Sequence, residues 1–137
     1  MSADSREKFI QNWFLVAADD LRFAEAGYKE TKIARDACFL CHQSAEKYLK
    51  GFLISTSQDP PRVHLLLRLL DIAISQDDSF RAVEESCRLL DNYYNPARYP
   101  DDVSGEYSAT QAEEALMAAQ KVKQFVMSKI NPKFVEV

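Results

Sequence analysis

Residues 37–54, ACFLCHQSAEKYLKGFLI, carry the pattern that decides the fold. Within this stretch Ala37, Cys41, Ala45, Tyr48 and Phe52 recur at intervals of three and four residues, the period of one face of an α-helix. The first three are small and would let a neighbouring helix approach closely, whereas the later ones are large and would fill a wider gap. We therefore expect a helix over about residues 33–57 that acts as a packing spine.

The same period continues on both sides of this stretch. It predicts helices over about residues 4–28, 63–76, 80–94 and 108–130, with capping-box starts at Asp4/Glu7 and Ser108/Gln111. Only 3 Gly and 5 Pro leave little material for hairpin turns. We therefore expect an all-α fold, an antiparallel (up-and-down) helical bundle of four long helices plus one shorter helix, forming a single domain over residues 1–137.

Composition and charge narrow the classes of function. A net charge of −4 and a pI near 5.2 disfavour a general nucleic-acid binder, which normally presents a basic face. No apolar run approaches the length that a membrane span requires. The polar start MSADSREKF lacks the apolar core of a secretory signal, and 3 cysteines are an odd number, so reduced thiols in the cytoplasm are expected.

Residues 38–42, CFLCH, match the C-x-x-C-H string of haem attachment. The string lies in the middle of a predicted helix, however, with Cys41 on its core stripe, and so small a bundle leaves no obvious cavity for a porphyrin. A structural zinc site would have only Cys87 and His64 as further Cys or His ligands, and these two are not paired. We therefore interpret the cysteines as buried packing residues and expect no metal and no cofactor.

The charged residues that follow the cysteines allow two interpretations. Glu46 and Lys50 form an i,i+4 pair in the favourable orientation, worth a few tenths of a kcal/mol if exposed. Asp19 and Asp20 on the first helix could reach Lys47 or Lys50 across a helix interface. Structural ion pairing is one interpretation, and a binding face is the other.

The segment YNPARYPD, residues 94–101, is the least generic part of the chain. Its two prolines restrict the backbone, while Tyr94, Arg98, Tyr99 and Asp101 offer aromatic faces, a guanidinium group and a carboxylate. Arginine suits phosphate and aromatic rings suit bases. A rigid connection in which Arg98 pairs with a neighbouring aspartate remains the alternative.

Taken together, the strings at 17–29, 37–54, 60–70 and 90–102 resemble the landmarks of the HEPN domain in order and spacing. These landmarks are an Asp-Leu in the first helix, A-E-K-x-L-K in the second, a His opening the third and R-Y-P after the fourth. The resemblance covers nearly the whole chain. It implies a homodimeric bundle of four or five helices, often paired with a minimal nucleotidyltransferase and proposed to bind nucleotides. Other branches are ribonucleases, often toxins of toxin–antitoxin pairs.

In those ribonuclease branches, an Arg is followed after four to six residues by a His near the end of the bundle. This sequence has no His after Arg98, and Arg35 with His42 reproduces the spacing only in the second helix. We therefore expect a non-catalytic HEPN module that partners a nucleotidyltransferase and binds a nucleotide near Arg98. The alternatives are a dimeric ribonuclease using Arg35 with His42 or His64, and a purely structural dimerisation domain. The expected ligand-binding residues are Arg98, Tyr99, Asp101, Tyr94, Lys47, Lys50, Glu46 and His64.

Overall fold

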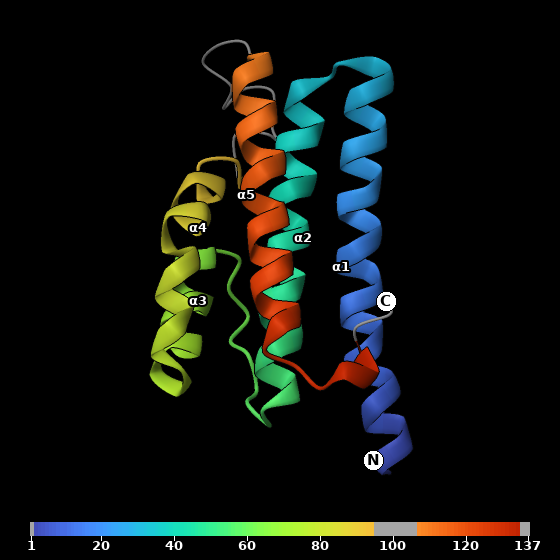
Figure 1. The fold of residues 1–137 in the computed structure, drawn as a ribbon, viewed down its shortest axis with the longest axis vertical. Coiled ribbons are helices and arrows are strands. Elements are labelled where there is room, and N and C mark those ends of the chain that lie inside the picture. Colours follow the sequence, from blue (N-terminus) through green and yellow to red (C-terminus); the bar gives the residue numbers. More distant parts are fainter. Residues whose placement is uncertain (1, 95–106, 135–137) are drawn as a thin grey trace.

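The structure is a computed structural model, which describes residues 2–94 and 107–134. Over these residues the chain forms five α-helices and two short 3₁₀ helices, and no strand (Figure 1). In chain order the elements are α1 (Ala3–Thr31), α2 (Ala34–Ser55), α3 (Leu66–Gln76), η1 (Asp78–Val83), α4 (Glu84–Asp91), α5 (Ala109–Ser128) and η3 (Pro132–Phe134). The predicted all-α helical bundle is confirmed.

Helix α2 is the centre of the bundle. It packs against α1 on one side and against α5, α3 and α4 on the others, and α1, α2 and α5 lie side by side in Figure 1. The small residues Ala37, Cys41 and Ala45 are all buried, as a packing spine requires. The shorter α3 and α4 cover the side of the bundle that lies away from α1 (Figure 1).

Helices α1 and α2 pack closely, and no spare volume remains between Gly51 and Phe14. A Cβ atom placed on Gly51 would lie 2.7 Å from Cε1 of Phe14, so this position requires glycine. About two turns earlier on α2, the buried hydroxyl of Ser44 donates a hydrogen bond of 2.7 Å to the carbonyl oxygen of Ala17. Because Ser44 finds its acceptor on α1, a polar residue is tolerated inside this interface.

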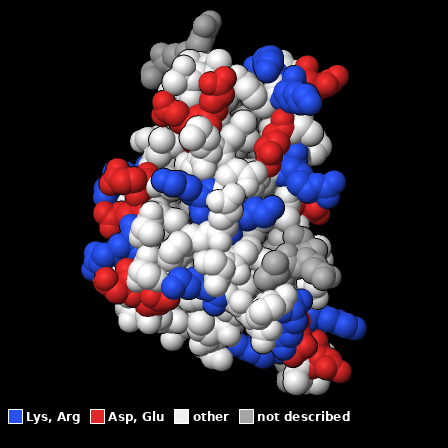
Figure 2. Space-filling view, viewed as in Figure 1, with Lys and Arg blue, Asp and Glu red and all other residues white. Residues whose placement is uncertain are grey.

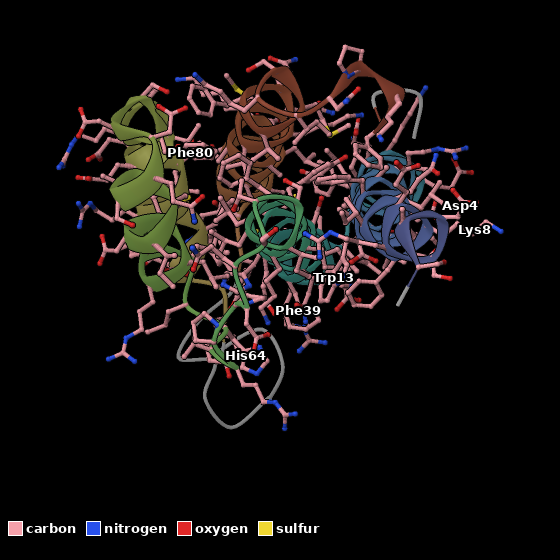
Figure 3. The ribbon with its side chains drawn as sticks, turned by 90° about the horizontal axis from the view of Figure 1, so that it is seen from below. Asp4, Lys8, Trp13, Phe39, His64 and Phe80 are labelled. Carbon is pink, nitrogen blue, oxygen red and sulfur yellow. The ribbon has the colours of Figure 1, made fainter. Side chains whose placement is uncertain are left out.

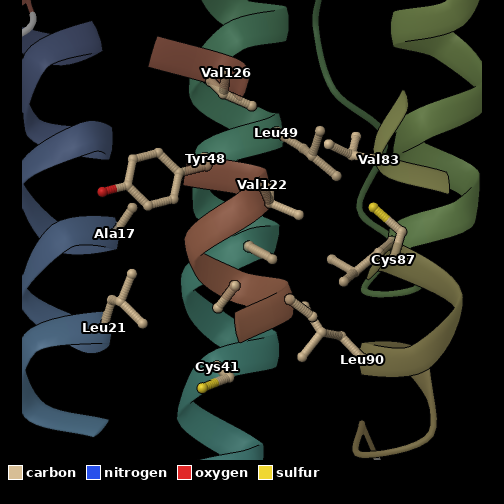
Figure 4. Close-up of a cluster of buried hydrophobic side chains, with 14 of the residues drawn as sticks. Ala17, Leu21, Cys41, Tyr48, Leu49, Val83, Cys87, Leu90, Val122 and Val126 are labelled. Atoms are coloured by element: carbon tan, nitrogen blue, oxygen red, sulfur yellow. The ribbon is translucent and has the colours of Figure 1, made fainter. Parts of the chain in front are cut away.

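The core continues from this interface through α2 to the opposite side of the bundle. Figure 4 shows Leu21 of α1 near Cys41 of α2, and Leu49 and Val122 between them and the α4 side chain of Cys87. All five side chains are buried. Cys38 is also buried, so the interpretation of the cysteines as packing residues is confirmed.

The first and last residues of some helices differ from the sequence prediction. They differ where another residue than the predicted one caps the helix. The cap of α1 is Ser2, whose hydroxyl accepts from the amide of Ser5, and not Asp4; the helix also continues past Gly27. The fourth helix is shorter than predicted because Asp77 accepts from the amide of Ser79 and starts a 3₁₀ turn before α4. The capping box of Ser108 and Gln111 is confirmed.

No helix within the described residues is long and apolar enough to cross a membrane. On the face shown in Figure 2, acidic and basic side chains are interspersed. That face offers no broad basic surface of the kind that general nucleic-acid binding requires.

Candidate functional site

Six polar and aromatic side chains from three separate segments meet where α3 begins. Three come from successive turns of α2, one from the segment before α3, and two from the end of α4 and the residues after it. We call this group the Glu46 cluster; its members are His42, Glu46, Lys50, His64, Asp91 and Tyr94.

Glu46 is the hub of the cluster. Its side chain is only 7% exposed, and its Oε2 atom accepts a hydrogen bond of 2.9 Å from Nζ of Lys50. The same oxygen lies 3.2 Å from Nδ1 of His64. A carboxylate buried to this degree is tolerated only with such partners, so Glu46 orients Lys50 and His64 toward one another. The pair with Lys50 is therefore partly buried, not the exposed helix pair that the spacing alone suggests.

His42 links the hub to the end of α4. The imidazole is fully buried, and its Nε2 atom lies 3.1 Å from Oδ1 of Asp91. Asp91 also accepts from the backbone amides of Leu66 at 2.7 Å and Leu67 at 3.1 Å. One carboxylate thus fixes both a buried histidine and the first turn of α3, which has no side-chain cap of its own.

Tyr94 closes the cluster with its ring. The ring centroid lies 5.3 Å from that of His64 at an interplanar angle of 23°, and 5.5 Å from that of His42. Both distances fall in the range of favourable aromatic pairs. Tyr94 therefore contacts both His42, which precedes Glu46 in the sequence, and His64, which follows it.

Two buried polar atoms at the centre of the cluster have no partner within the described part of the chain. Nδ1 of His42 and Oε1 of Glu46 have no hydrogen-bond partner among the described residues, and they lie 4.0 Å apart. A carboxylate oxygen accepts, whereas a ring nitrogen of histidine donates or accepts according to its tautomer. A small polar group placed between the two atoms would therefore find a partner in each.

Half of the predicted ligand-binding residues belong to this cluster. Glu46, Lys50, His64 and Tyr94 come together, although they are up to 48 positions apart in the sequence. Lys47 does not join them, because its ammonium group pairs with Asp20 on α1.

The remaining three predicted residues, Arg98, Tyr99 and Asp101, lie outside the described residues. In the sequence Arg98 follows Tyr94 by four positions.

Sequence reasoning missed two members of the cluster, His42 and Asp91. The sequence drew attention to His42 only as part of the CFLCH string or with Arg35. Its spacing of four to Glu46 and of eight to Lys50 places all three on one face of the helix, and this signal could have identified it. For Asp91 the sequence offers no comparable signal, because its partners include backbone amides on another helix.

Within one chain, Arg35 and His42 do not come together. Arg35 is exposed at the start of α2 and pairs with the adjacent Asp36, whereas His42 is buried two turns further on. The thiols nearby are also unsuited to chemistry, since burial raises the pKa of Cys38 and of Cys87 to about 12. Within the described ranges, no group of three or more His, Cys, Asp or Glu side chains is arranged to hold a metal ion.

Comparison with known proteins identifies relatives in sequence and structure. The model of the HEPN domain family matches residues 10–130. The crystal structure of TT1696 from Thermus thermophilus is 35% identical with a TM-score of 0.79, covering 88% of this chain and 98% of that one. ST0689, described as an archaeal HEPN homologue, is 29% identical with a TM-score of 0.73, covering 89% and 98%. No curated protein matches the chain.

Proposed function

The chain belongs to the HEPN domain family, and we propose that it is a homodimeric, non-catalytic member that partners a minimal nucleotidyltransferase and binds a nucleotide at the Glu46 cluster. The observation that carries the nucleotide site is the convergence of Lys50 and His64 on one buried carboxylate, with the Tyr94 ring stacked on that of His64. These residues come from α2, from the segment before α3 and from the residues after α4, so only the folded chain can bring them together.

The cluster offers the groups that nucleotide recognition requires. Lys50 and His64 are nitrogen donors for phosphate oxygens, and Tyr94 and His64 present flat faces on which a base can stack. His64 is the accessible member, with 49% of its side chain exposed, and Glu46 holds its inner nitrogen. In this proposal Arg98, four positions after Tyr94 in the sequence, supplies the guanidinium that binds the phosphate in a bidentate manner.

The state of His42 supports a non-catalytic role. A general base must reach the proton that it removes, and His42 is fully buried with Nε2 engaged by Asp91. Incubation of RNA with the purified protein is therefore expected to leave the RNA intact. Cleavage that is abolished by His42→Ala or His64→Ala would establish the ribonuclease alternative instead.

Nucleotide titration tests the proposed site. We expect ATP to bind the wild-type protein in calorimetry, and His64→Ala and Arg98→Ala to weaken that binding by about tenfold or more, because each removes a donor to phosphate. Arg88→Ala is the matched control, since Arg88 is an exposed arginine on α4 that pairs with Glu84. Absence of binding by the wild type, or equal binding by all four proteins, would overturn the nucleotide site.

Partnership with a nucleotidyltransferase has a separate test. The chain is co-expressed with a minimal nucleotidyltransferase, and the mixture is passed over a size-exclusion column. We expect the two proteins to elute together at one mass. Separate elution at micromolar concentration would overturn the partnership without affecting the nucleotide site.

A further inference from the structure

Helix α1 carries a second apolar stripe beside the face that packs into the core, with Trp13 partly buried against it. Phe9 and Val16 are 44% and 43% exposed, and Phe23 is 71% exposed. Trp13 lies between the first two and packs edge-on against Phe9, with ring centroids 6.4 Å apart. Isolated exposed apolar residues are ordinary, but a row of large ones along one helix marks an interaction surface.

The stripe has the spacing of a helix-pairing seam. Its positions alternate in steps of three and four residues, the repeat with which two helices pack side by side. We call this row the α1 seam; its members are Arg6, Phe9, Trp13, Val16, Asp20, Phe23, Gly27 and Glu30. From Phe9 to Gly27 the seam spans 18 residues, about 27 Å of helix at the standard rise.

The seam is also self-complementary. Its positions are symmetric about Ala18, so an antiparallel copy of α1 meets every seam position with another seam position. In that register Trp13 faces Phe23 of the other copy, an aromatic pair, and Val16 faces Asp20. A two-fold interface requires this property, because the same patch must serve both partners.

The two ends and the polar position of the seam fit the same register. At each end Arg6 comes opposite Glu30 of the other copy, although its guanidinium already donates to the Ile54 carbonyl oxygen at 2.7 Å and to the Ser57 hydroxyl at 3.1 Å within its own chain. Phe9 faces Gly27, where a Cβ atom would find no other heavy atom closer than 4.0 Å and the large ring has room. Asp20 is paired with Lys47 within its own chain, which reduces the cost of covering its carboxylate.

From this complementarity we infer that the α1 seam is the surface through which two copies of this chain pair, antiparallel and two-fold symmetric about Ala18. The inference rests on the homodimer of the proposed function and is independent of the nucleotide site. Figure 3 shows Trp13 and His64 pointing to the same side of the molecule, so the paired helices would lie on the side that carries the Glu46 cluster.

Sedimentation equilibrium tests the surface. The wild type is expected to show twice the 15.6 kDa chain mass at micromolar concentration. Phe23→Glu places a charge in both halves of the interface and is expected to raise the dissociation constant of the dimer at least about 100-fold. Met117→Glu is the matched control, since Met117 is also 71% exposed but lies on α5, and it should remain dimeric.

Cross-linking tests the register. Phe9→Cys and Gly27→Cys proteins are mixed and treated with a short bis-maleimide. A cross-linked dimer is expected from the mixture, because these positions face each other, and not from either variant alone, because the two copies of one position are then about 27 Å apart. Wild type should not react, since Cys38, Cys41 and Cys87 are buried.

The outcomes separate this inference from the rest of the proposal. A wild type that stays monomeric at high concentration overturns both the seam interface and the proposed homodimer, while the nucleotide titration remains informative. A dimeric wild type with a dimeric Phe23→Glu variant and no cross-link in the mixture overturns the seam interface alone.

Discussion

At the scale of single residues, the tightest constraint in the described fold is the contact between Gly51 and Phe14. Gly51→Ala would bring Cβ to 2.7 Å from Cε1 and 3.1 Å from Cδ1 and Cζ of Phe14, so the Phe14 ring or one of the helices α1 and α2 must shift. Overpacking of this kind costs about 1–3 kcal/mol, offset by less than about 1 kcal/mol of gained helix propensity. We expect Gly51→Ala to lower the free energy of unfolding by about 1–2 kcal/mol in urea denaturation.

Gly27→Ala is the control for this prediction, because the substitution is the same and the position is also inside a helix. The nearest heavy atoms to its added Cβ belong to Phe23, at 4.0 Å. With no clash, only the helix propensity changes, and the free energy of unfolding should rise by about 0.5–1 kcal/mol at low protein concentration. A Gly51→Ala protein as stable as the wild type would contradict the close approach of α1 and α2.

At the scale of elements, the structure depends on a cap supplied by another helix. Asp91 of α4 accepts from the amides of Leu66 and Leu67 and contacts His42, and its side chain is only 12% exposed. Asp91→Ala leaves these buried donors without an acceptor, which costs about 1–3 kcal/mol for each group that finds no replacement. We expect a loss of about 2–4 kcal/mol in the free energy of unfolding, measured by thermal or urea denaturation.

The matched control is Asp78→Ala. Asp78 is also an aspartate near a helix start, but it is 81% exposed and pairs with Arg81. Exposed pairs contribute little, so its removal should change stability by less than about 1 kcal/mol. If both substitutions cost the same, Asp91 would not be the anchor of α3 that its contacts indicate.

The same element shows why helices were predictable and some of their ends were not. The repeat of apolar residues identified every α-helix of the described chain, because burial on one face leaves a local signal in the sequence. The capping box of Ser108 and Gln111 was also predictable, since both partners lie within four residues. The start of α3 was not, because its acceptor is Asp91, 25 positions further along the chain.

In the candidate site, too, local sequence signals were predictable and contacts between distant segments were not. Glu46, Lys50, His64 and Tyr94 are all expected from the sequence to act in binding, since each is a polar or aromatic residue in a family landmark. Their meeting around Glu46 and His64 could not be derived, because it depends on how the segment before α3 and the residues after α4 pack against α2. Lys47 separates from them for the same reason: adjacent residues on a helix face different neighbours, and its neighbour is α1.

At the scale of the whole molecule, α1 contributes both to the core and to the proposed dimer interface. Its inner face packs against α2, and its outer face carries the α1 seam, so any loss of α1 docking would disturb both the fold and the proposed dimer. Contacts with α2 are extensive, whereas those with α5 are fewer. After α5, η3 brings the described chain back toward the amino-terminal half of α1 and adds a further contact there (Figure 1).

This return contact gives a prediction for the molecule as a whole. Phe134 in η3 is 6% exposed and lies 6.2 Å from Phe14 of α1, centroid to centroid. Phe134→Ala removes the ring that covers this end of the core and should lower the free energy of unfolding by about 2–4 kcal/mol. Hydrogen exchange at the α1 amides around Phe14 should accelerate more than exchange in α3. Lys133→Ala removes an exposed ion pair with Glu7 and an ammonium 5.4 Å from the Phe134 ring centroid but keeps the ring, so it should cost less than about 1 kcal/mol. Equal effects of the two substitutions would show that η3 does not hold α1 through its phenylalanine.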